Sequence, residues 1–164
     1  MYAKRQHIRI AEVHECFMLA HLVQKSYGDV AERFNLTPQN CPKHPSNCTS
    51  DWVEKDMNRG VRYYCLDLGE KTIGCVAFEK ARAQEGYLER LAVWPEYRQN
   101  GFGKMLVHHV FEVAKTSGVS RIGIGIISEQ QDLKQWYVKM GFVEQEIKTF
   151  SHLPFKVSLM AYTL

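Results

Sequence analysis

The stretch from Arg98 to Lys104 combines residue types that suit a phosphate group. It reads Arg-Gln-Asn-Gly-Phe-Gly-Lys, and apolar residues at helical spacing follow it from Leu106 onward. The first amides of a helix have no partner within the helix, and the helix dipole places about half a positive elementary charge at that end. Gly101 and Gly103 lack a Cβ, so a phosphate can approach the backbone closely. The sequence therefore predicts a pyrophosphate site at a helix N-terminus, with Arg98 and Lys104 adding positive charge.

Two common phosphate motifs do not fit this loop, because a third Gly at dinucleotide-fold spacing and a Gly-x-x-x-x-Gly-Lys-Ser/Thr sequence are both absent. The chain instead resembles the GNAT superfamily of acyl-CoA N-acyltransferases. The resemblance covers residues 61–163 well, and residues 1–60 only in the loose order of their elements. It rests on two separated patterns: Leu91-Ala-Val93, Pro95 and Arg98-x-x-Gly101-x-Gly103, followed by Trp136-Tyr137-x-x-x-Gly141-Phe142.

The resemblance implies acetyl-CoA as cosubstrate and direct transfer to a primary amine. In the family the pantetheine arm pairs with the strand that here carries Leu91, Ala92 and Val93. Tyr137 matches the tyrosine that commonly protonates the CoA sulfur; the alternative is a core aromatic on a helix. The implied pyrophosphate contacts are the amides of Gln99, Asn100, Gly101, Phe102, Gly103 and Lys104.

The reaction needs a base, because an amine with a pKa near ~10 is almost fully protonated at pH 7. Glu89 is the first candidate, since two-residue alternation would place it on one strand face with Tyr87, Leu91 and Val93. Many family members carry the acidic residue at the position of Tyr87, so the sequence departs from the family there. The alternative for Glu89 is a surface residue or a partner for Arg90.

His152 is the second base candidate, because its unperturbed pKa lies near neutrality. It lies between the last two expected strands, a region that often shapes the acceptor site in the resembled family. The alternative is a polar turn before Pro154.

Periodicity and turn signals predict one α/β (α+β) domain over residues 1–164. The resemblance implies a GNAT-type mixed, mostly antiparallel sheet flanked by helices, with splayed parallel strands forming the acyl-CoA cleft. One helix is expected over 12–27, with Gly28 as its stop. Its apolar face is expected to carry Val13, Phe17, Ala20 and Val23, widened by Leu19 and Leu22. A short helix over 51–59 has Ser50 as its expected N-cap. The other expected elements are strands at 8–10, 61–68, 72–79, 87–93, 119–127, 142–149 and 154–163, and helices after the Gly101 loop and at 129–140.

The segment Cys41-x-x-His44-x-x-x-Cys48 has soft ligands at a spacing that zinc could use. A closed site needs a fourth ligand, and only His152, brought close by the fold, is available for that role. We expect no metal. The alternatives are a zinc-dependent interaction module or a loop that lines the acceptor pocket.

Composition narrows the class of partner. The net charge is +3 without a Lys/Arg-rich run, so nucleic acid is not an expected partner. No membrane-length apolar run is present, and an odd count of five Cys favours a reducing cytoplasm. The expected acceptor is a small-molecule or peptide amine, and the resemblance leaves a homodimer open. The alternative function is a non-catalytic acyl-CoA-binding sensor or interaction module.

Overall fold

The computed structural model describes residues 4–164, so the first three residues of the expected 1–164 domain lie outside the described residues. All described strands form one sheet in the order β1-β2-β3-β4-β5-β7-β6, in which only β4 and β5 are parallel. This confirms the expected mixed, mostly antiparallel sheet. The strands are β1 (Gln6–Ile10), β2 (Arg62–Leu68), β3 (Lys71–Lys80), β4 (Glu85–Val93), β5 (Arg121–Ile127), β6 (Val143–Thr149) and β7 (Lys156–Thr163).

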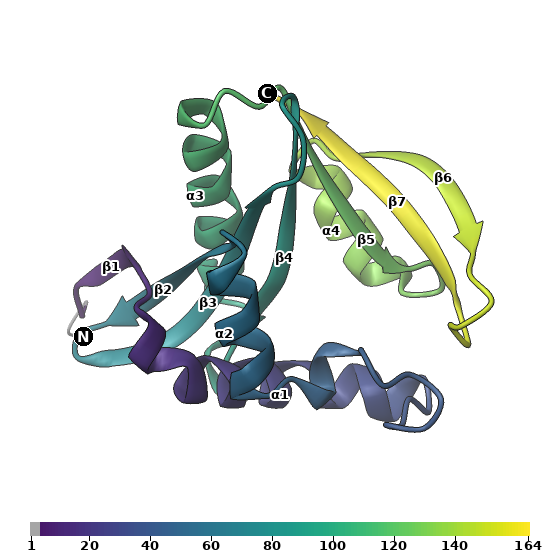
Figure 1. Ribbon diagram of the computed structural model, residues 1–164, viewed down its shortest axis with the longest axis horizontal. Coiled ribbons are helices and arrows are strands. Elements are labelled where there is room, and N and C mark those ends of the chain that lie inside the picture. Colours follow the sequence, from purple (N-terminus) through teal and green to yellow (C-terminus); the bar gives the residue numbers. More distant parts are fainter. Residues whose placement is uncertain (1–3) are drawn as a thin grey trace.

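Helices cover both faces of the sheet (Figure 1). On one face α1 (Cys16–Arg33) and α2 (Ser50–Asn58) bury Leu19 and Val53 against the strands. On the other face α3 (Phe102–Thr116) and α4 (Gln131–Lys139) enclose the larger apolar core, which includes Leu106. The sheet therefore separates two apolar layers, one on each face.

The expected stop of the first helix at Gly28 is wrong, because α1 continues to Arg33. A glycine inside a helix costs only about 1 kcal/mol relative to alanine. Tertiary packing beyond it offsets that cost: Ala31 is buried in a small cluster with Leu36 and Cys41. The additional turn carries α1 to the loop that precedes α2.

The expected start of that helix also needs correction. Residues Val13–Glu15 form a 3-10 turn, and Val13 and Phe17 are 56% and 80% exposed rather than buried. The rest of the expected stripe is confirmed, because Leu19, Ala20, Leu22 and Val23 are buried, and Cys16 joins them. For α2 the N-cap is Thr49, not Ser50, because the Thr49 side chain accepts a hydrogen bond from the Trp52 amide.

The parallel strands β4 and β5 separate along their length. They pair only at Glu85–Arg121, Gly86–Ile122 and Tyr87–Gly123. Beyond Tyr87 the two strands diverge, and Figure 1 shows the gap widening toward α1. The expected splay is therefore present, and it leaves one edge of β4 without a neighbouring strand.

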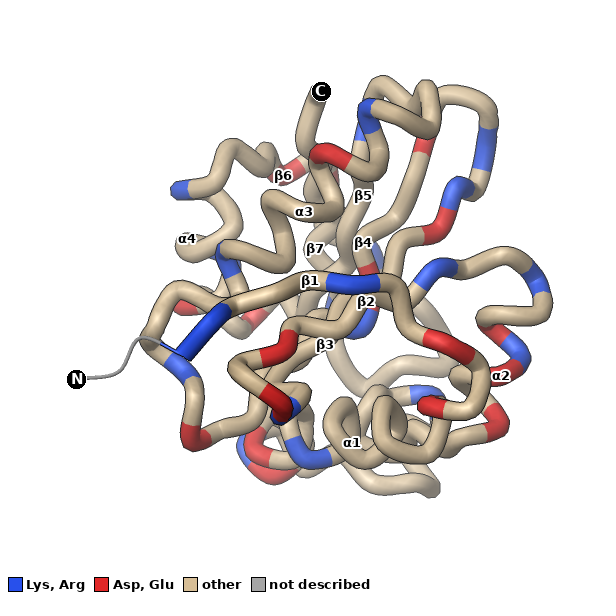
Figure 2. The backbone as a smooth tube through the Cα atoms, turned by 90° about the vertical axis from the view of Figure 1, so that its left-hand side faces the viewer, with Lys and Arg blue, Asp and Glu red and all other residues tan. Residues whose placement is uncertain are grey.

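Charged residues of both signs are interspersed along the backbone (Figure 2), in keeping with a net charge of +3. Among residues 4–164, no helix combines the length and apolar character needed to cross a bilayer.

Candidate active site

The loop before α3 presents backbone amides that have no hydrogen-bond partner among residues 4–164. Gly101 is the N-cap of α3 with a φ of 81°, and no side chain caps the helix. The side-chain amide of Asn100 donates to the carbonyl oxygens of Tyr97 at 3.0 Å and Arg98 at 2.9 Å, which holds the turn closed. With the carbonyls turned inward, the amides at the start of α3 are left for an anion.

Glycine is favoured at positions 101 and 103 for two different structural reasons. A Cβ on Gly101 would meet nothing within 4 Å, so the left-handed backbone is what favours glycine there. A Cβ on Gly103 would lie 3.3 Å from Cζ2 and Cη2 of Trp136, so Gly103 makes room for the indole of α4. The loop motif and the Trp136-Tyr137 motif, separate in the sequence, thus pack against each other.

Arg98 faces α1 rather than the loop amides. Its guanidinium donates to Asp29 at 2.8 Å and to the Ser26 carbonyl oxygen at 2.6 Å. Lys104 is exposed in the first turn of α3. Of the two cations expected beside the phosphate site, Arg98 is therefore paired with α1, whereas Lys104 is exposed at the start of α3.

A β-bulge at Arg90 changes which way the side chains of β4 point. Arg90 has a φ of 52°, and a two-residue step on β3 (Ala77 to Cys75) matches a three-residue step on β4 (Glu89 to Ala92). Ala92 consequently packs with the α1 and α2 layer, while Val93 packs with the α3 layer. The expectation that Glu89 shares a face with Leu91 and Val93 is wrong, because the extra residue reverses the alternation.

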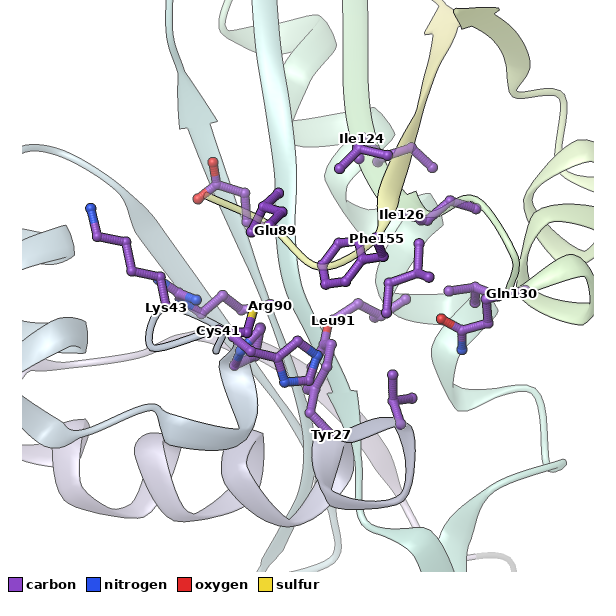
Figure 3. Close-up of a pocket in the computed structure, with 18 of the residues that line it drawn as sticks. Tyr27, Cys41, Lys43, Glu89, Arg90, Leu91, Ile124, Ile126, Gln130 and Phe155 are labelled. Carbon is purple, nitrogen blue, oxygen red and sulfur yellow. The ribbon is translucent and has the colours of Figure 1, made fainter. Parts of the chain in front are cut away.

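A cavity of about 780 Å³ occupies the gap between β4 and β5 (Figure 3). Its walls come from α1, the loop before α2, both splayed strands, α4 and the connection between β6 and β7. All three expected catalytic residues, Glu89, Tyr137 and His152, line it. Leu91 lines it as well, whereas the loop residues from Arg98 to Lys104 do not.

Glu89 is a half-buried carboxyl in the cavity wall, and its pKa is raised. It lines the cavity from β4, with its carboxylate directed away from Leu91 and Phe155 (Figure 3). Burial, reinforced by the neighbouring carboxyl of Glu79, raises the pKa of Glu89 to about 7. A carboxylate with this pKa is ionised at slightly alkaline pH and accepts a proton more readily than an ordinary glutamate.

Tyr137 is buried on α4 at the opposite wall. Its ring makes edge contacts with Trp136 at 5.0 Å and with Phe142 at 5.2 Å between ring centroids. Burial raises the pKa of Tyr137, so the hydroxyl stays protonated and can act as a proton donor. Gly141 ends the turn after α4 with a φ of 105°, where a Cβ would lie 2.8 Å from the Tyr162 ring.

His152 lies on the exposed turn between β6 and β7, and its ring meets Phe150 edge-on at 5.7 Å. Several other lining residues were not expected from the sequence. Tyr27 comes from the middle of α1, and Leu153 and Phe155 come from the same turn as His152. Their types are common in apolar cores, so only their position in the fold marks them.

The loop carrying Cys41, His44 and Cys48 is a wall of the cavity. Cys41 and His44 line it, and Cys48 is fully buried elsewhere, with its thiol 3.8 Å from the Thr49 carbonyl oxygen. The Nδ1 atom of His44 lies 2.8 Å from the Ser46 hydroxyl. Within residues 4–164, no three His, Cys, Asp or Glu side chains are grouped so as to hold a metal ion.

Comparisons with known proteins agree with this geometry. A model of the acetyltransferase (GNAT) family matches residues 28–142. The chain is 28% identical over 100 residues to the ribosomal protein bS18-alanine N-acetyltransferase of Salmonella typhimurium, covering 59% of this chain and 68% of that protein.

Two solved structures show the same fold. The ribosomal-protein-S18-alanine N-acetyltransferase from Escherichia coli matches with a TM-score of 0.77 and 16% identity, over 97% of this chain and 94% of that one. The PaiA N-acetyltransferase from Thermoplasma acidophilum, in complex with coenzyme A, gives a TM-score of 0.74 and 18% identity, over 98% and 99% of the two chains. Since the family model spans more than half of the sequence, the chain belongs to the GNAT acetyltransferase family and is an acetyl-CoA-dependent acyltransferase.

Proposed function

We propose that this protein transfers the acetyl group of acetyl-CoA directly to the nitrogen of a primary amine. The observation that carries the proposal is a single cavity, at the splay of β4 and β5, that brings together a carboxyl with a pKa of about 7 and a buried tyrosine hydroxyl. A direct transfer needs one group to accept a proton and another to donate one, and Glu89 and Tyr137 supply this pair.

The transfer exchanges one bond at the acetyl carbon and moves protons among the acceptor, Glu89, Tyr137 and the CoA sulfur. Glu89 removes a proton from the ammonium form of the acceptor, directly or through water, and frees the nitrogen lone pair. The nitrogen forms a bond to the acetyl carbonyl carbon, and the bond from that carbon to the CoA sulfur then breaks. Tyr137 donates its proton to the departing sulfur, and the second proton that the new amide nitrogen loses restores the Tyr137 hydroxyl, directly or through water. Glu89 releases its proton to solvent, so the transfer releases one proton overall. His152, on the rim of the cavity, is the second candidate for the base.

The cosubstrate would lie along the free edge of β4. Beyond Tyr87 this edge has no strand partner, which supports the placing of the pantetheine arm beside Leu91, Ala92 and Val93. The unpaired amides between Gln99 and Lys104 would hold the pyrophosphate. Asn100 keeps the loop folded, and Arg98 ties it to α1. We further propose that the chain acts as one catalytic domain, because all its described strands form a single sheet.

The acceptor enters this proposal only as a class, a small molecule or a peptide that offers a primary amine. The similar bacterial proteins are named as acetyltransferases of a ribosomal-protein alanine, which supports a peptide N-terminus as one acceptor to test. The walls nearest Glu89 come from the loop at Cys41 and from the turn at Phe155, so these segments would contact it (Figure 3).

Thermal unfolding tests the cosubstrate first. The purified protein is melted alone and with acetyl-CoA, CoA or NAD. A ligand specific for the folded state adds about 2.7 kcal/mol at a hundredfold excess over Kd, which raises the melting temperature by several degrees. We expect this rise with both CoA species and not with NAD. No rise in the melting temperature with acetyl-CoA would refute the proposal. After a positive result, amines, including peptides with N-terminal alanine, are screened by release of free CoA thiol.

A further inference from the structure

A second carboxyl lies beside the proposed base on the neighbouring strand. In the register of β3 and β4, Ala77 is opposite Glu89 and Glu79 is opposite Tyr87, so Glu79 and Glu89 are diagonal neighbours on one face of the sheet. Diagonal pairs are about 7–8 Å apart at the backbone, within reach of two glutamate side chains. Hydrogen bonding and charge repulsion from Glu79 add to burial in raising the pKa of Glu89.

Glu79 is itself held by the C-terminal end of α2. The guanidinium of Arg59 forms an ion pair with Glu79 and also donates to Oδ1 of Asp56 at 3.0 Å. Asp56 is only 6% exposed and accepts a hydrogen bond from the Tyr63 hydroxyl at 2.6 Å. Arg90, the bulge residue, donates to the same hydroxyl at 3.0 Å. A continuous chain of polar contacts thus joins α2, β2 and β4 to the carboxyl pair.

We propose that Glu79 is a positioning residue that makes Glu89 a stronger base, and that the ion pair with Arg59 holds the Glu79 carboxylate in place for that role. The inference rests on the proposed function, in which Glu89 takes the proton from the acceptor amine. An ionised Glu79 beside Glu89 disfavours a second negative charge, so Glu89 binds a proton more tightly. Arg59 forms its ion pair with Glu79, so the cation of Arg59 belongs to the same group of charges as the two carboxyls.

The two variants Glu79→Gln and Arg59→Gln have opposite expected effects. Removing the carboxylate of Glu79 relieves the repulsion, so Glu89 should titrate at lower pH. Removing the cation of Arg59 stabilises the protonated forms of the pair, so the same titration should move to higher pH. Other titratable or charged side chains that face Glu89 or line the cavities beside it are unchanged in both variants: Tyr27, Cys41, Lys43, His44, Asp56, Glu85, Tyr87, Arg90, Arg121, Tyr137, Glu146 and His152.

The experiment follows the Glu89 carboxyl carbon by NMR in protein labelled at the glutamate side-chain carboxyl, with the signal assigned by its loss in Glu89→Gln. In Glu79→Gln we expect the midpoint to fall by on the order of one pH unit. Glu85→Gln is the matched control, because it also removes one carboxylate and lies on β4, the strand that carries Glu89. It lies four residues from Glu89, about 13 Å along a strand and beyond the screening length at 0.1 M salt, and should leave the midpoint in place.

An unchanged midpoint in Glu79→Gln, or an equal shift in Glu85→Gln, would overturn the role of Glu79. A shift to lower pH in Arg59→Gln would overturn the role of Arg59. If Glu79→Gln melts before the titration is complete, the direction of the Arg59→Gln shift decides. The titration needs no acceptor, so a failure of the proposed function appears separately, as wild-type protein that binds no acetyl-CoA and releases no thiol with any amine.

Discussion

The guanidinium of Arg98 donates to Oδ2 of Asp29 at 2.8 Å, which fastens the loop before α3 to a helix 69 residues earlier in the chain. A second donation, to the Ser26 carbonyl oxygen, strengthens the link. The hydroxyl of Ser26 also accepts from the amide of Val93 at 3.3 Å. Since α1 contributes Tyr27 to the cavity, these contacts tie the proposed phosphate loop to a wall of the proposed acceptor site.

Asp29→Asn should weaken CoA binding, because the loop then has to be ordered by the ligand. The pair is partly exposed and should contribute at most about 1 kcal/mol, or roughly fivefold in Kd. Titration calorimetry with CoA measures the effect. Glu112→Gln, which breaks an exposed ion pair with Lys115 on α3, is the control and should leave the CoA affinity unchanged. Tighter CoA binding in Asp29→Asn would instead mean that Asp29 holds Arg98 away from the phosphate.

Gly101→Ala should destabilise the protein more than Gly103→Ala. An alanine at a φ of 81° costs about 1–2 kcal/mol, and relieving the strain would move the N-terminal amides and weaken CoA binding. At Gly103 the added methyl meets only the edge of the Trp136 indole, and the gain in helix propensity partly offsets that contact. Melting temperatures and CoA affinities of both variants check this order, and the reverse order would contradict it.

Tyr137→Phe should lower kcat severalfold or more and leave CoA affinity nearly unchanged, because only the proton donor is removed. Single-turnover thiol release and calorimetry separate the two quantities. Tyr162→Phe is a matched control, since Tyr162 stacks on Phe111 at 4.0 Å between ring centroids and does not line the cavity. Wild-type turnover in Tyr137→Phe would remove Tyr137 from the mechanism.

The rate should depend on the ionisation of Glu89. With a pKa of about 7, kcat/KM should fall roughly tenfold per pH unit below that value, and Glu89→Gln should lose most of the activity. If Glu89→Gln keeps the rate and the acid limb, His152 becomes the base, and His152→Asn should then abolish both. If both Glu89→Gln and His152→Asn keep the wild-type rate and its fall at low pH, neither side chain is the base.

The same pKa predicts a change in stability with pH. The value of about 7 in the folded state is above that of an unfolded glutamate, so the folded state binds the proton more tightly. The resulting stability is complete below about pH 4 and is lost as the pH rises through 7. Glu89→Gln should therefore raise the free energy of unfolding relative to wild type at pH 8 and not at pH 4, by on the order of 3 kcal/mol at most. Melting temperatures of both proteins at the two pH values measure this difference. An equal difference at both values would contradict this.

Local features were predictable because their causes lie within a few residues. Gly101 begins α3 because its neighbours are a turn and an amphipathic run, and Gly118 and Gly141 end helices at positive φ for the same kind of reason. The family itself was also within reach of the sequence, because its two signatures are each short and appear in a set order. The site residues Glu89 and Tyr137 stay predictions as to their roles, although one cavity brings them together.

Only the tertiary structure decided the features that depend on distant partners. The Arg90 bulge reverses the alternation of β4, because pairing with β3, and not the residue types of β4, sets that register. The helix passes through Gly28 because burial of Ala31 outweighs a weak local preference. The pairs Glu79–Glu89 and Arg98–Asp29 join segments that have no reason to meet until the sheet forms. Backbone preferences act over one or two turns, whereas a cavity and its charges arise from contacts across the whole fold.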